Sequence, residues 1–391
     1  MTNLAETVRK GEDSRTQFKL RFNSADALGS EISAMANSEG GLILVGISDK
    51  GEIIGVEDLQ GLNQLISNTC SQKIEPPVSV ITENIIHKDK RVVIITVPRG
   101  ANRPYAVNKH DFWIKVGADK RRASREELRR LMQASGALYA DEMPVPDTAI
   151  SDADMYFFHR FYEENYGISI EETGLPTEKA MTNLKLAKGE HLTLAGLLLF
   201  GKRPEIIRPQ YLVKAVAFAG NDITDTEYLD SEDMGGPLSV VFKNSMGFLK
   251  RSLRKQQKGQ GFNSLGILEI PEIAMEEALV NALIHRDYFV NSGVRLFVFD
   301  KRVEIISPGR LPNTVTSENI RYGIQIARNP ILLSFVSKLR IPYRGIGSGV
   351  MRMISECRKS GIPTPEFVEN REANFFKVIF ARPEASESPL T

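Results

Sequence analysis

The stretch EALVNALIHRDY, residues 277–288, carries an acid and an amide among apolar neighbours. Glu277 and Asn281 lie four residues apart, so a helix places both side chains on one face. Burial of an unpaired polar group costs roughly several kcal/mol, so the two groups must be paired or must bind a ligand. A carboxylate can activate water as a general base, and an amide oxygen suits a hard cation such as Mg²⁺.

Glycines further along the chain supply a second feature that suits a ligand. SPGRLP, residues 307–312, is a turn that leaves a strand, where Gly309 lets the backbone pass close to a bound molecule. RGIGSGV, residues 344–350, places glycines at alternate positions before a helix, and they are Gly345, Gly347 and Gly349. Such a helix start presents backbone N–H groups and positive potential to a phosphate. The combination predicts a site for a nucleotide, a magnesium ion and an activated water.

A purely structural interpretation accounts for the same residues. Glu277 would then cap its helix or form an ion pair, with Arg286 or Arg344 as the candidate partners. The glycines would serve only as turns. Each motif alone favours this interpretation, whereas the motifs taken together and in order favour nucleotide binding.

The elements that must position these residues fall into successive segments of an α+β, multidomain protein. A chain of 391 residues exceeds one ordinary core, and its composition changes along its length. Residues 1–135 alternate turns with β-rich runs, residues 136–264 form a linker and a mixed connector, and residues 265–381 alternate helices and strands. The polar tail, residues 382–391, is expected to be disordered.

Periodicity and turn residues predict the individual elements. Ser124 and Glu127 form a capping box that begins a helix. Strands are predicted at residues 40–48, 91–98, 111–117, 211–218, 293–299, 302–309 and 374–381. Helices are predicted at residues 152–167, 273–288 and 347–361, and a further one with a strongly basic end runs over residues 235–259.

Composition and charge exclude several classes of protein. A formal net charge of +1 excludes a bulk polycation, so any contact with nucleic acid must depend on local clusters. The longest apolar run, LTLAGLLLF, is far short of the roughly 20 residues of a membrane span. The polar amino terminus lacks the apolar core of a signal peptide, and two distant cysteines suggest no disulfide. We therefore expect a cytoplasmic protein without a membrane partner.

The motifs of residues 265–381 resemble the GHKL-type ATPase fold, and most closely its divergent branch with a RecG-like C-terminal ATP-binding domain. The resemblance rests on ALVNALIHRDY, ISPGRLP, ARNP and RGIGSGVMRM, which occur in this order. It implies ATP with Mg²⁺ as cofactors, and residues 320–330 as a lid. It also implies that Glu277 is the general base, that Asn281 coordinates Mg²⁺ and that Gly309 lines an adenine pocket. The phosphates would contact Gly345, Gly347 and Gly349.

One departure from this pattern concerns recognition of the base. The family has an aspartate in a DxGxG turn that contacts the adenine amino group, whereas this chain has Ser307-Pro308-Gly309 there. The substitution removes the carboxylate that would select adenine.

The stretches GEDSRTQFK, ANSEGGLILVGISDKGEIIGV and PYAVNKHDFWIKVGADKRRASREELRRL resemble the Schlafen-type AlbA domain. In nuclease members, three carboxylates hold a divalent metal that polarises a phosphodiester and activates water. Glu12 matches the first and Asp49 the third of these acids, but Gln17 stands at the second position. A neutral amide binds Mg²⁺ or Mn²⁺ more weakly, so a nuclease is the less favoured expectation.

Basic residues of the same block are the predicted contacts with DNA or RNA. Neutralised phosphates release counterions, which drives such binding. The candidates are Lys19, Arg21, Lys120, Arg121, Arg122, Arg129 and Arg130. The alternative is a solvated helix face, because Glu126 and Glu127 are interspersed among the arginines.

From end to end the chain resembles the bacterial family described as predicted transcriptional regulators. The resemblance implies a nucleic-acid-binding protein controlled by ATP binding or hydrolysis, acting in transcription regulation or phage defence as a homo-oligomer. One alternative is a metal-dependent nuclease gated by ATP. The other is a non-enzymatic DNA-binding regulator whose nucleotide pocket is degenerate.

Overall fold

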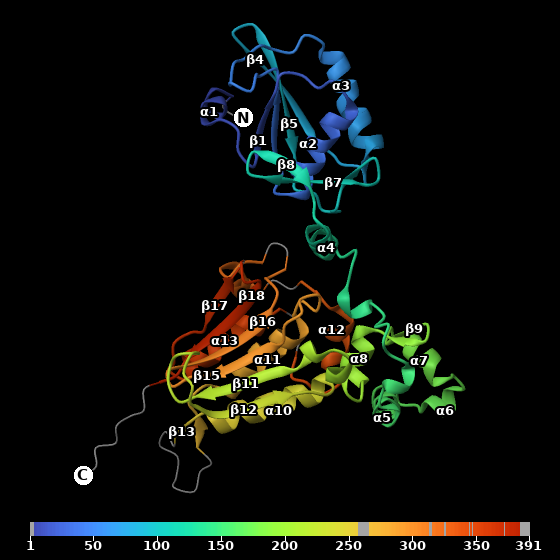
Figure 1. Cartoon of the computed structure of the whole chain (residues 1–391), viewed down its shortest axis with the longest axis vertical. Coiled ribbons are helices and arrows are strands. Elements are labelled where there is room, and N and C mark those ends of the chain that lie inside the picture. The colour runs from blue at the N-terminus through green and yellow to red at the C-terminus, as the bar shows by residue number, and fades with distance from the viewer. Residues whose placement is uncertain are drawn as a thin grey trace, which may run out of the picture. The chain divides into compact units, whose positions relative to one another are not determined.

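Two compact units make up the chain, Met1–Leu138 and Tyr139–Thr391. The computed structural model describes residues 4–256, 266–312, 315–323, 326–343, 345, 347–370 and 372–383. Each unit has its own sheets and its own hydrophobic core, and Figure 1 labels their elements. The mixture of helices with several sheets confirms the predicted α+β class.

The amino unit contains a four-stranded sheet in the order β1-β2-β5-β4. Its strands are β1 (Thr16–Lys19), β2 (Gly41–Val45), β5 (Lys90–Val97) and β4 (Ile81–His87). β1 and β2 are parallel, and the other pairs are antiparallel. Alternate residues of β5 enter two cores, Val93 and Ile95 on one face and Val92 and Ile94 on the other. Burial on both faces explains the continuous apolar run of this strand.

A second sheet in this unit has the order β3-β6-β7-β8. Helix α2 (Ala25–Asn37) packs against it, and the Asn37 amide donates to the carbonyls of Tyr105 and Trp113. Ser124 and Glu127 form the predicted capping box at the start of helix α4. The remaining elements are α1 (Leu4–Lys10), α3 (Leu59–Asn68), η1 (Thr69–Lys73), β3 (Ile74–Glu75), β6 (Ala106–Val107), β7 (Asp111–Val116), β8 (Asp119–Arg122) and α4 (Arg125–Ala134).

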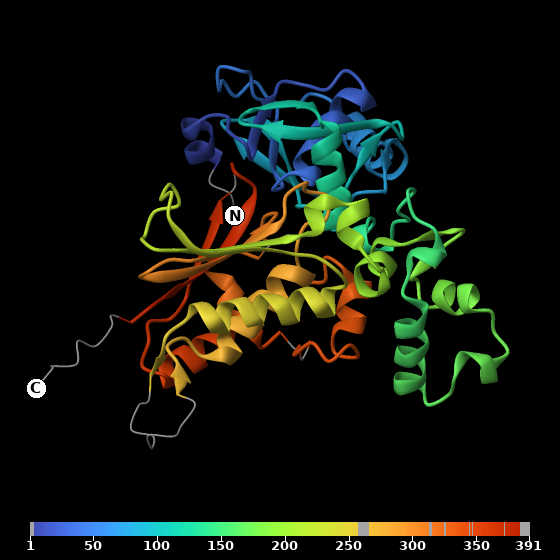
Figure 2. The same cartoon turned by 60° about the horizontal axis from the view of Figure 1, so that its bottom comes forward.

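The carboxyl unit is organised around a six-stranded sheet in the order β12-β11-β15-β16-β18-β17. Its strands are β12 (Tyr228–Met234), β11 (Val213–Phe218), β15 (Val294–Val298), β16 (Arg302–Pro308), β18 (Phe375–Ala381) and β17 (Glu366–Asn370). β11 and β15 are parallel, and the remaining pairs are antiparallel. Helices α10 (Leu238–Ser252), α11 (Glu272–Ile284) and α13 (Gly349–Lys359) lie on one face, as Figure 2 shows.

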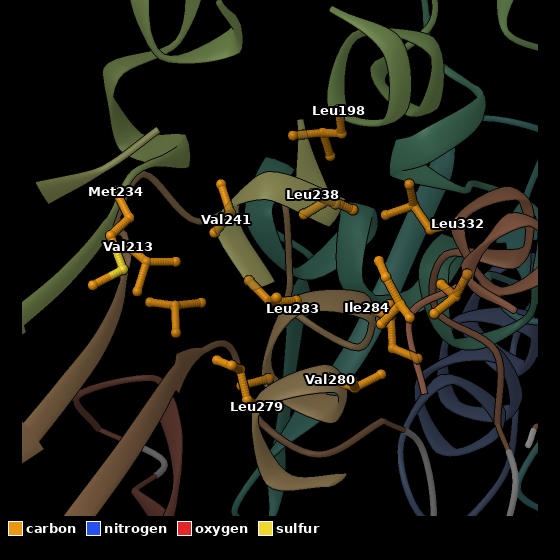
Figure 3. Packing of buried hydrophobic residues seen from close by; sticks show 14 of the residues in the cluster. Leu198, Val213, Met234, Leu238, Val241, Leu279, Val280, Leu283, Ile284 and Leu332 are labelled. Atoms are coloured by element: carbon orange, nitrogen blue, oxygen red, sulfur yellow. The ribbon is translucent and has the colours of Figure 1, made fainter. Parts of the chain in front are cut away.

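Helix α11 is central to the core of this unit because it is apolar on nearly all sides. Figure 3 shows its Leu283 near Val241 of α10, and its Ile284 facing Leu332 of α12. A helix buried in this way holds its few polar side chains in fixed positions. Glu277 and Asn281 are two of them.

Smaller elements complete the carboxyl unit. They are η2 (Ala140–Glu142), η3 (Ile150–Asp152), α5 (Met155–Tyr166), α6 (Ile170–Thr173), α7 (Thr177–Asn183), β9 (Ala187–Lys188), β10 (His191–Leu192), α8 (Leu194–Phe200), α9 (Pro204–Ile207), η4 (Pro209–Tyr211), β13 (Lys255–Gln256), β14 (Ile267–Leu268), η5 (Asn319–Tyr322) and α12 (Pro330–Val336). None of the helices that the structure describes has both the length and the apolar character that a membrane crossing requires.

The structure differs from the predicted segment boundary at residue 264. β11, β12 and α10 come from residues 136–264, yet β11 pairs with β15 in the same sheet and α10 packs in the same core. The predicted connector therefore supplies part of the carboxyl unit. Helix α10 also ends at Ser252, before the end of the predicted basic helix, and β13 follows it. Arg382, at the start of the predicted disordered tail, pairs with the buried Glu269, while residues 384–391 lie outside the described part.

Asp141 attaches the start of the carboxyl unit to helix α12. Its fully buried carboxylate accepts hydrogen bonds from the backbone N–H groups of Ile331 and Leu332, at 2.7 and 3.0 Å. Burial raises the pKa of Asp141 to about 6. The side chain therefore satisfies two buried donors at the first turn of α12, in the manner of a helix cap.

We predict that Asp141→Ala lowers the free energy of unfolding by about 2 kcal/mol or more, because two buried N–H groups lose their acceptor. Asp141→Asn keeps an oxygen acceptor and should cost less than about 1 kcal/mol. Asp147→Ala removes an exposed partner of Arg208 and serves as the control, with an effect of at most about 1 kcal/mol. Denaturant unfolding measures all three. Equal losses in Asp141→Ala and Asp147→Ala would contradict the capping role.

Candidate functional site

A single cavity of the carboxyl unit collects the residues that the sequence singled out. It encloses about 1110 Å³, including the part of its mouth that is open to solvent. Its walls come from α11, α13, the strands β16, β17 and β18, and the segments that follow Gly309 and Arg328. The predicted residues that border it are Glu277, Asn281, Gly309, Gly345, Gly347 and Gly349.

The acid and the amide form a pair inside this cavity. The Asn281 side-chain nitrogen donates to Glu277 Oε1 at 3.1 Å, and Glu277 is only 4% exposed. This bond uses the N–H side of the amide, so the amide oxygen is not consumed by the pair. The predicted arrangement on one helix face is therefore present.

Gly349 brings the start of α13 against this pair. A Cβ atom added at Gly349 would lie 1.9 Å from Glu277 Oε1, a distance that no side chain can occupy. The absence of a Cβ at this first helical residue lets the backbone approach the carboxylate closely, and a larger residue there would require the Glu277 side chain to move. The glycine-rich stretch and the acid are thus adjacent, although 72 residues separate them in the sequence.

The rest of the cavity is largely apolar. Its lining includes Ile305, Val315, Phe367, Phe376 and Val378. A cavity with an apolar part and a polar end lined by an acid, an amide and glycine backbone suits a ligand with a flat ring and an anionic tail.

His285, Tyr343 and Arg328 add polar groups that the sequence analysis did not assign. His285 Nε2 lies 3.4 Å from the Tyr343 hydroxyl, and all three residues border the cavity. Burial, with the Arg328 charge as a second cause, lowers the pKa of His285 to about 4. The Arg328 guanidinium donates to the carbonyls of His285 and Arg310, at 3.0 and 2.6 Å. His285 is therefore a neutral hydrogen-bonding group at neutral pH.

The turn at the position of the family aspartate is tightly packed. Ser307, which is 7% exposed, donates its hydroxyl to the Ala282 carbonyl at 2.9 Å. A Cβ at Gly309 would lie 2.3 Å from Asp287 Cβ, and Gly309 has a φ of +95°, so glycine is required there on both grounds. Asp287 Oδ1 in turn accepts from the Phe289 N–H at 3.0 Å, just beyond the end of α11.

The structure also tests the ion pair of the alternative interpretation. Arg286 donates to the Ser292 carbonyl at 2.6 Å, and its guanidinium lies 5.3 Å from the Tyr211 ring centroid and 4.8 Å from that of Tyr288. These contacts engage Arg286 away from Glu277. Arg344, the other candidate partner, lies outside the described residues.

The predicted acids of the amino unit occupy different environments. Glu12 Oε1 accepts from the Gln17 amide and from the Phe18 N–H, so it is fixed against β1. Asp49 is exposed in the turn after β2. Among the residues that the structure describes, no three His, Cys, Asp or Glu side chains are grouped so that they could hold a metal ion.

Most of the predicted basic contacts are paired with acids. Arg121 forms two 2.8 Å bonds with Glu127, which lowers the pKa of that carboxyl to about 2. Arg122 pairs with Asp111 at 2.7 Å. Arg129 and Arg130 share Glu126, at 2.6 and 3.2 Å. Lys19 and Lys120 instead approach the buried Glu31, and Arg21 is exposed after β1.

Comparison with protein families agrees with the predicted architecture. Residues 12–124 match the family model described as "Schlafen, AlbA_2". Residues 291–380 match the model described as "Putative ATP-dependent DNA helicase recG C-terminal". The second match begins after α11, so Glu277 and Asn281 lie outside it. No curated protein gives a significant match.

Two solved structures resemble the chain weakly. The DIP2311 protein from Corynebacterium diphtheriae has 22% identity and a TM-score of 0.49, covering 97% of this chain and 80% of that chain. The N-terminal domain of a "Putative ATP-dependent DNA Helicase RecG-related Protein" from Nitrosomonas europaea has 19% identity and a TM-score of 0.23, covering 32% and 91%. At these values neither structure bears on the chemistry of the site.

We predict that Gly349→Ala destabilises the carboxyl unit by about 1–3 kcal/mol, because its methyl group displaces the Glu277 carboxylate. Gly247→Ala is the matched control, since Gly247 lies within helix α10 with open space around its Cα. Alanine there should stabilise the protein by about 0.5–1 kcal/mol. Thermal unfolding compares the two. If Gly349→Ala leaves the stability to thermal unfolding unchanged, the close contact between Gly349 and Glu277 is not required.

We predict that His285 makes stability fall at acidic pH. Its pKa is about 4 in the folded protein and about 6.5 in the unfolded chain, so the unfolded state alone gains the proton between these values. The contribution is complete above about pH 6.5 and is lost as the pH falls toward 4, by about 3 kcal/mol at pH 4. Asp141, with its pKa raised to about 6, acts in the opposite sense in this window, so a difference measurement is needed.

The free-energy difference between wild type and His285→Gln, measured at pH 7.5 and 4.5, isolates this contribution. Both proteins contain Asp141, whose effect cancels. The difference should shrink by about 2 kcal/mol at the lower pH. A difference that is constant with pH would show that His285 has an ordinary pKa.

Proposed function

We propose, from the premise that the chain joins a Schlafen AlbA_2 region to a recG C-terminal region, that it is a nucleic-acid-binding protein controlled by ATP. The carboxyl unit would bind ATP with Mg²⁺, and the amino unit would contact DNA or RNA. We further propose transcription regulation or phage defence as the setting and a homo-oligomer as the acting species.

The observation that carries the proposal is the meeting of Glu277, Asn281 and the glycine-rich start of α13 on one cavity. A neighbouring apolar region lined by Phe367 and Phe376 gives a base room to bind. Structural glycines and a salt-bridged acid would not require an apolar cavity beside them. The donor set therefore fits ATP and its cation.

Each residue has a distinct task in this proposal. Asn281 offers an amide oxygen, a hard ligand that suits Mg²⁺. ATP and Mg²⁺, when bound, supply the phosphoryl group and the charge that neutralises it. Glu277, held by the Asn281 amide, would accept a proton from the attacking water. Backbone N–H groups at Gly347 and Gly349 would contact phosphate oxygens.

Recognition of the base would depend on neutral groups. The Ser307 hydroxyl already donates to the Ala282 carbonyl. It therefore does not take over the contact that the family aspartate makes with the adenine amino group. His285 and Tyr343 are the polar groups in the cavity that can both donate and accept hydrogen bonds. This composition supports binding of a purine nucleotide with modest selectivity for adenine.

Thermal unfolding with and without ATP and Mg²⁺ tests the proposal. Nucleotide at 100 times its Kd should stabilise the carboxyl unit by about 2.7 kcal/mol. Glu277→Gln should keep this stabilisation and lose phosphate release, whereas Asn281→Ala should lose the part that depends on Mg²⁺. Glu272→Gln is the matched control, because Glu272 lies on the same helix but pairs with Lys250 outside the cavity.

Three outcomes are distinguishable. Stabilisation without phosphate release by wild type would mean that the nucleotide is a regulatory ligand and is not hydrolysed. Stabilisation that survives Asn281→Ala unchanged would contradict the role of the amide. No stabilisation by ATP or by any other nucleoside triphosphate would exclude the nucleotide site.

A further inference from the structure

We propose that Lys19, Lys115 and Lys120, termed the lysine cluster, bind one backbone phosphate of a nucleic acid. The inference rests on the proposed nucleic-acid binding of the amino unit and identifies the anchoring residues within it. Lys19 ends β1, the strand that runs parallel to β2, while Lys115 and Lys120 belong to the β7–β8 hairpin. Sequence alone does not indicate that these three residues meet.

The hairpin register creates a concentration of positive charge. Lys115 and Lys120 are direct partners across β7 and β8. Like charges directly opposite one another destabilise a strand pair, so an acid or an anion must offset them. The fold places Glu31 of α2 against this pair, with Lys120 Nζ bonded to Glu31 Oε1 and Lys19 Nζ at 3.9 Å from the same oxygen.

The buried Glu31 carboxylate lies between Lys19 and Lys120 of the lysine cluster. The Glu31 side chain is 4% exposed, and its Oε2 atom is buried without a hydrogen-bond partner among the described residues. Only the Oε1 atom of the carboxylate therefore contacts the ammonium groups. Two of these groups, on Lys19 and Lys120, remain 29% and 25% exposed and therefore reach solvent.

Lys115 is held from the other side of the cluster. Its Nζ donates to Gln17 Oε1 at 2.6 Å and to the Ala118 carbonyl. The Gln17 amide in turn donates to Glu12 Oε1. Partial burial, together with repulsion from Lys120 and Lys19, lowers the pKa of Lys115, while Glu31 and Glu12 act in the opposite sense. Gln17 therefore links the lysine cluster to Glu12.

The net charge of the lysine cluster and its acids matches one monovalent anion. Lys19 and Lys120 approach the Glu31 carboxylate, and Gln17 connects Lys115 to the Glu12 carboxylate, so three ammonium groups and two carboxylates leave one net positive charge. A phosphodiester carries one negative charge and would neutralise it. A fixed set of half-buried ammonium groups also loses less conformational freedom on binding than exposed lysines do.

The arginines of β8 and α4 are weaker candidates for the anchor. Arg121 is bonded in a bidentate manner to Glu127, and Arg129 is bonded to Glu126. A phosphate would have to compete with these carboxylates for the same donors. They provide matched controls, because they are basic, belong to the same unit and pair with more exposed carboxylates, whereas Lys120 pairs with the buried Glu31.

Binding of fluorescently labelled oligonucleotides of equal length, single- and double-stranded, measured by anisotropy at several NaCl concentrations, tests the inference. Lys19→Met and Lys120→Met should each weaken binding at least tenfold. Each should reduce the slope of log K against log [salt] by about 0.7 on single strands or 0.9 on duplex. Arg121→Met and Arg129→Met should stay within twofold of wild type.

Thermal unfolding of each variant separates binding from folding. If the lysines only neutralise Glu31, the lysine variants will lose stability and keep their affinity and salt slope, which overturns the inference. Losses of oligonucleotide affinity in Arg121→Met or Arg129→Met that equal or exceed those of the lysine variants overturn the inference as well. Titration with inorganic phosphate distinguishes a free anion from a polymer backbone: binding of phosphate alone, with unchanged oligonucleotide affinity in Lys120→Met, would contradict the nucleic-acid ligand. Wild-type protein that binds neither oligonucleotide would instead refute the proposed function of the amino unit.

Discussion

The contact between a glycine backbone and a buried carboxylate is the interaction on which the carboxyl-terminal cavity depends. Gly349 begins α13 where any side chain would overlap Glu277 Oε1. Because no Cβ intervenes, two helices far apart in sequence come close enough to share a wall. The buried acid is stabilised by the Asn281 amide, and the apolar surroundings of α11 keep both groups in place. Both Glu277 and Gly349 line the cavity, so a larger residue at the helix start would shift the acid within it.

Sequence reasoning identified the parts of this unit that have strong apolar patterns. β15, β16 and β18, together with α11 and α13, agree closely with the predicted elements because their burial follows their periodicity. The strands β12 and β17 were not predicted. Both lie at the edges of the sheet, and their sequences YLDSEDM and EFVEN are rich in acids and largely exposed. An edge strand needs few apolar residues, so its sequence resembles that of a loop.

The two candidate sites differ in how much of them a sequence can show. The glycines and the acid–amide pair are recognisable because each has a local spacing with a physical meaning. Lys115 and Glu31 have no such spacing, since their proximity follows from a hairpin register and from the packing of α2. The arginines of α4 show the reverse case, because Glu126 lies three and four residues from its partners and the pairing could be read from the sequence.

The buried carboxylate of Asp141 joins two parts of the carboxyl unit that lie far apart in the sequence. It holds the first turn of α12, the helix that follows Arg328 of the cavity wall and Asn329. The Asn329 amide donates to the carbonyls of Ile284 and Arg286, at the end of α11. The polypeptide enters this unit at Tyr139, two residues before that carboxylate. One buried side chain therefore fixes both the entry of the polypeptide into this unit and the helix that follows the cavity wall.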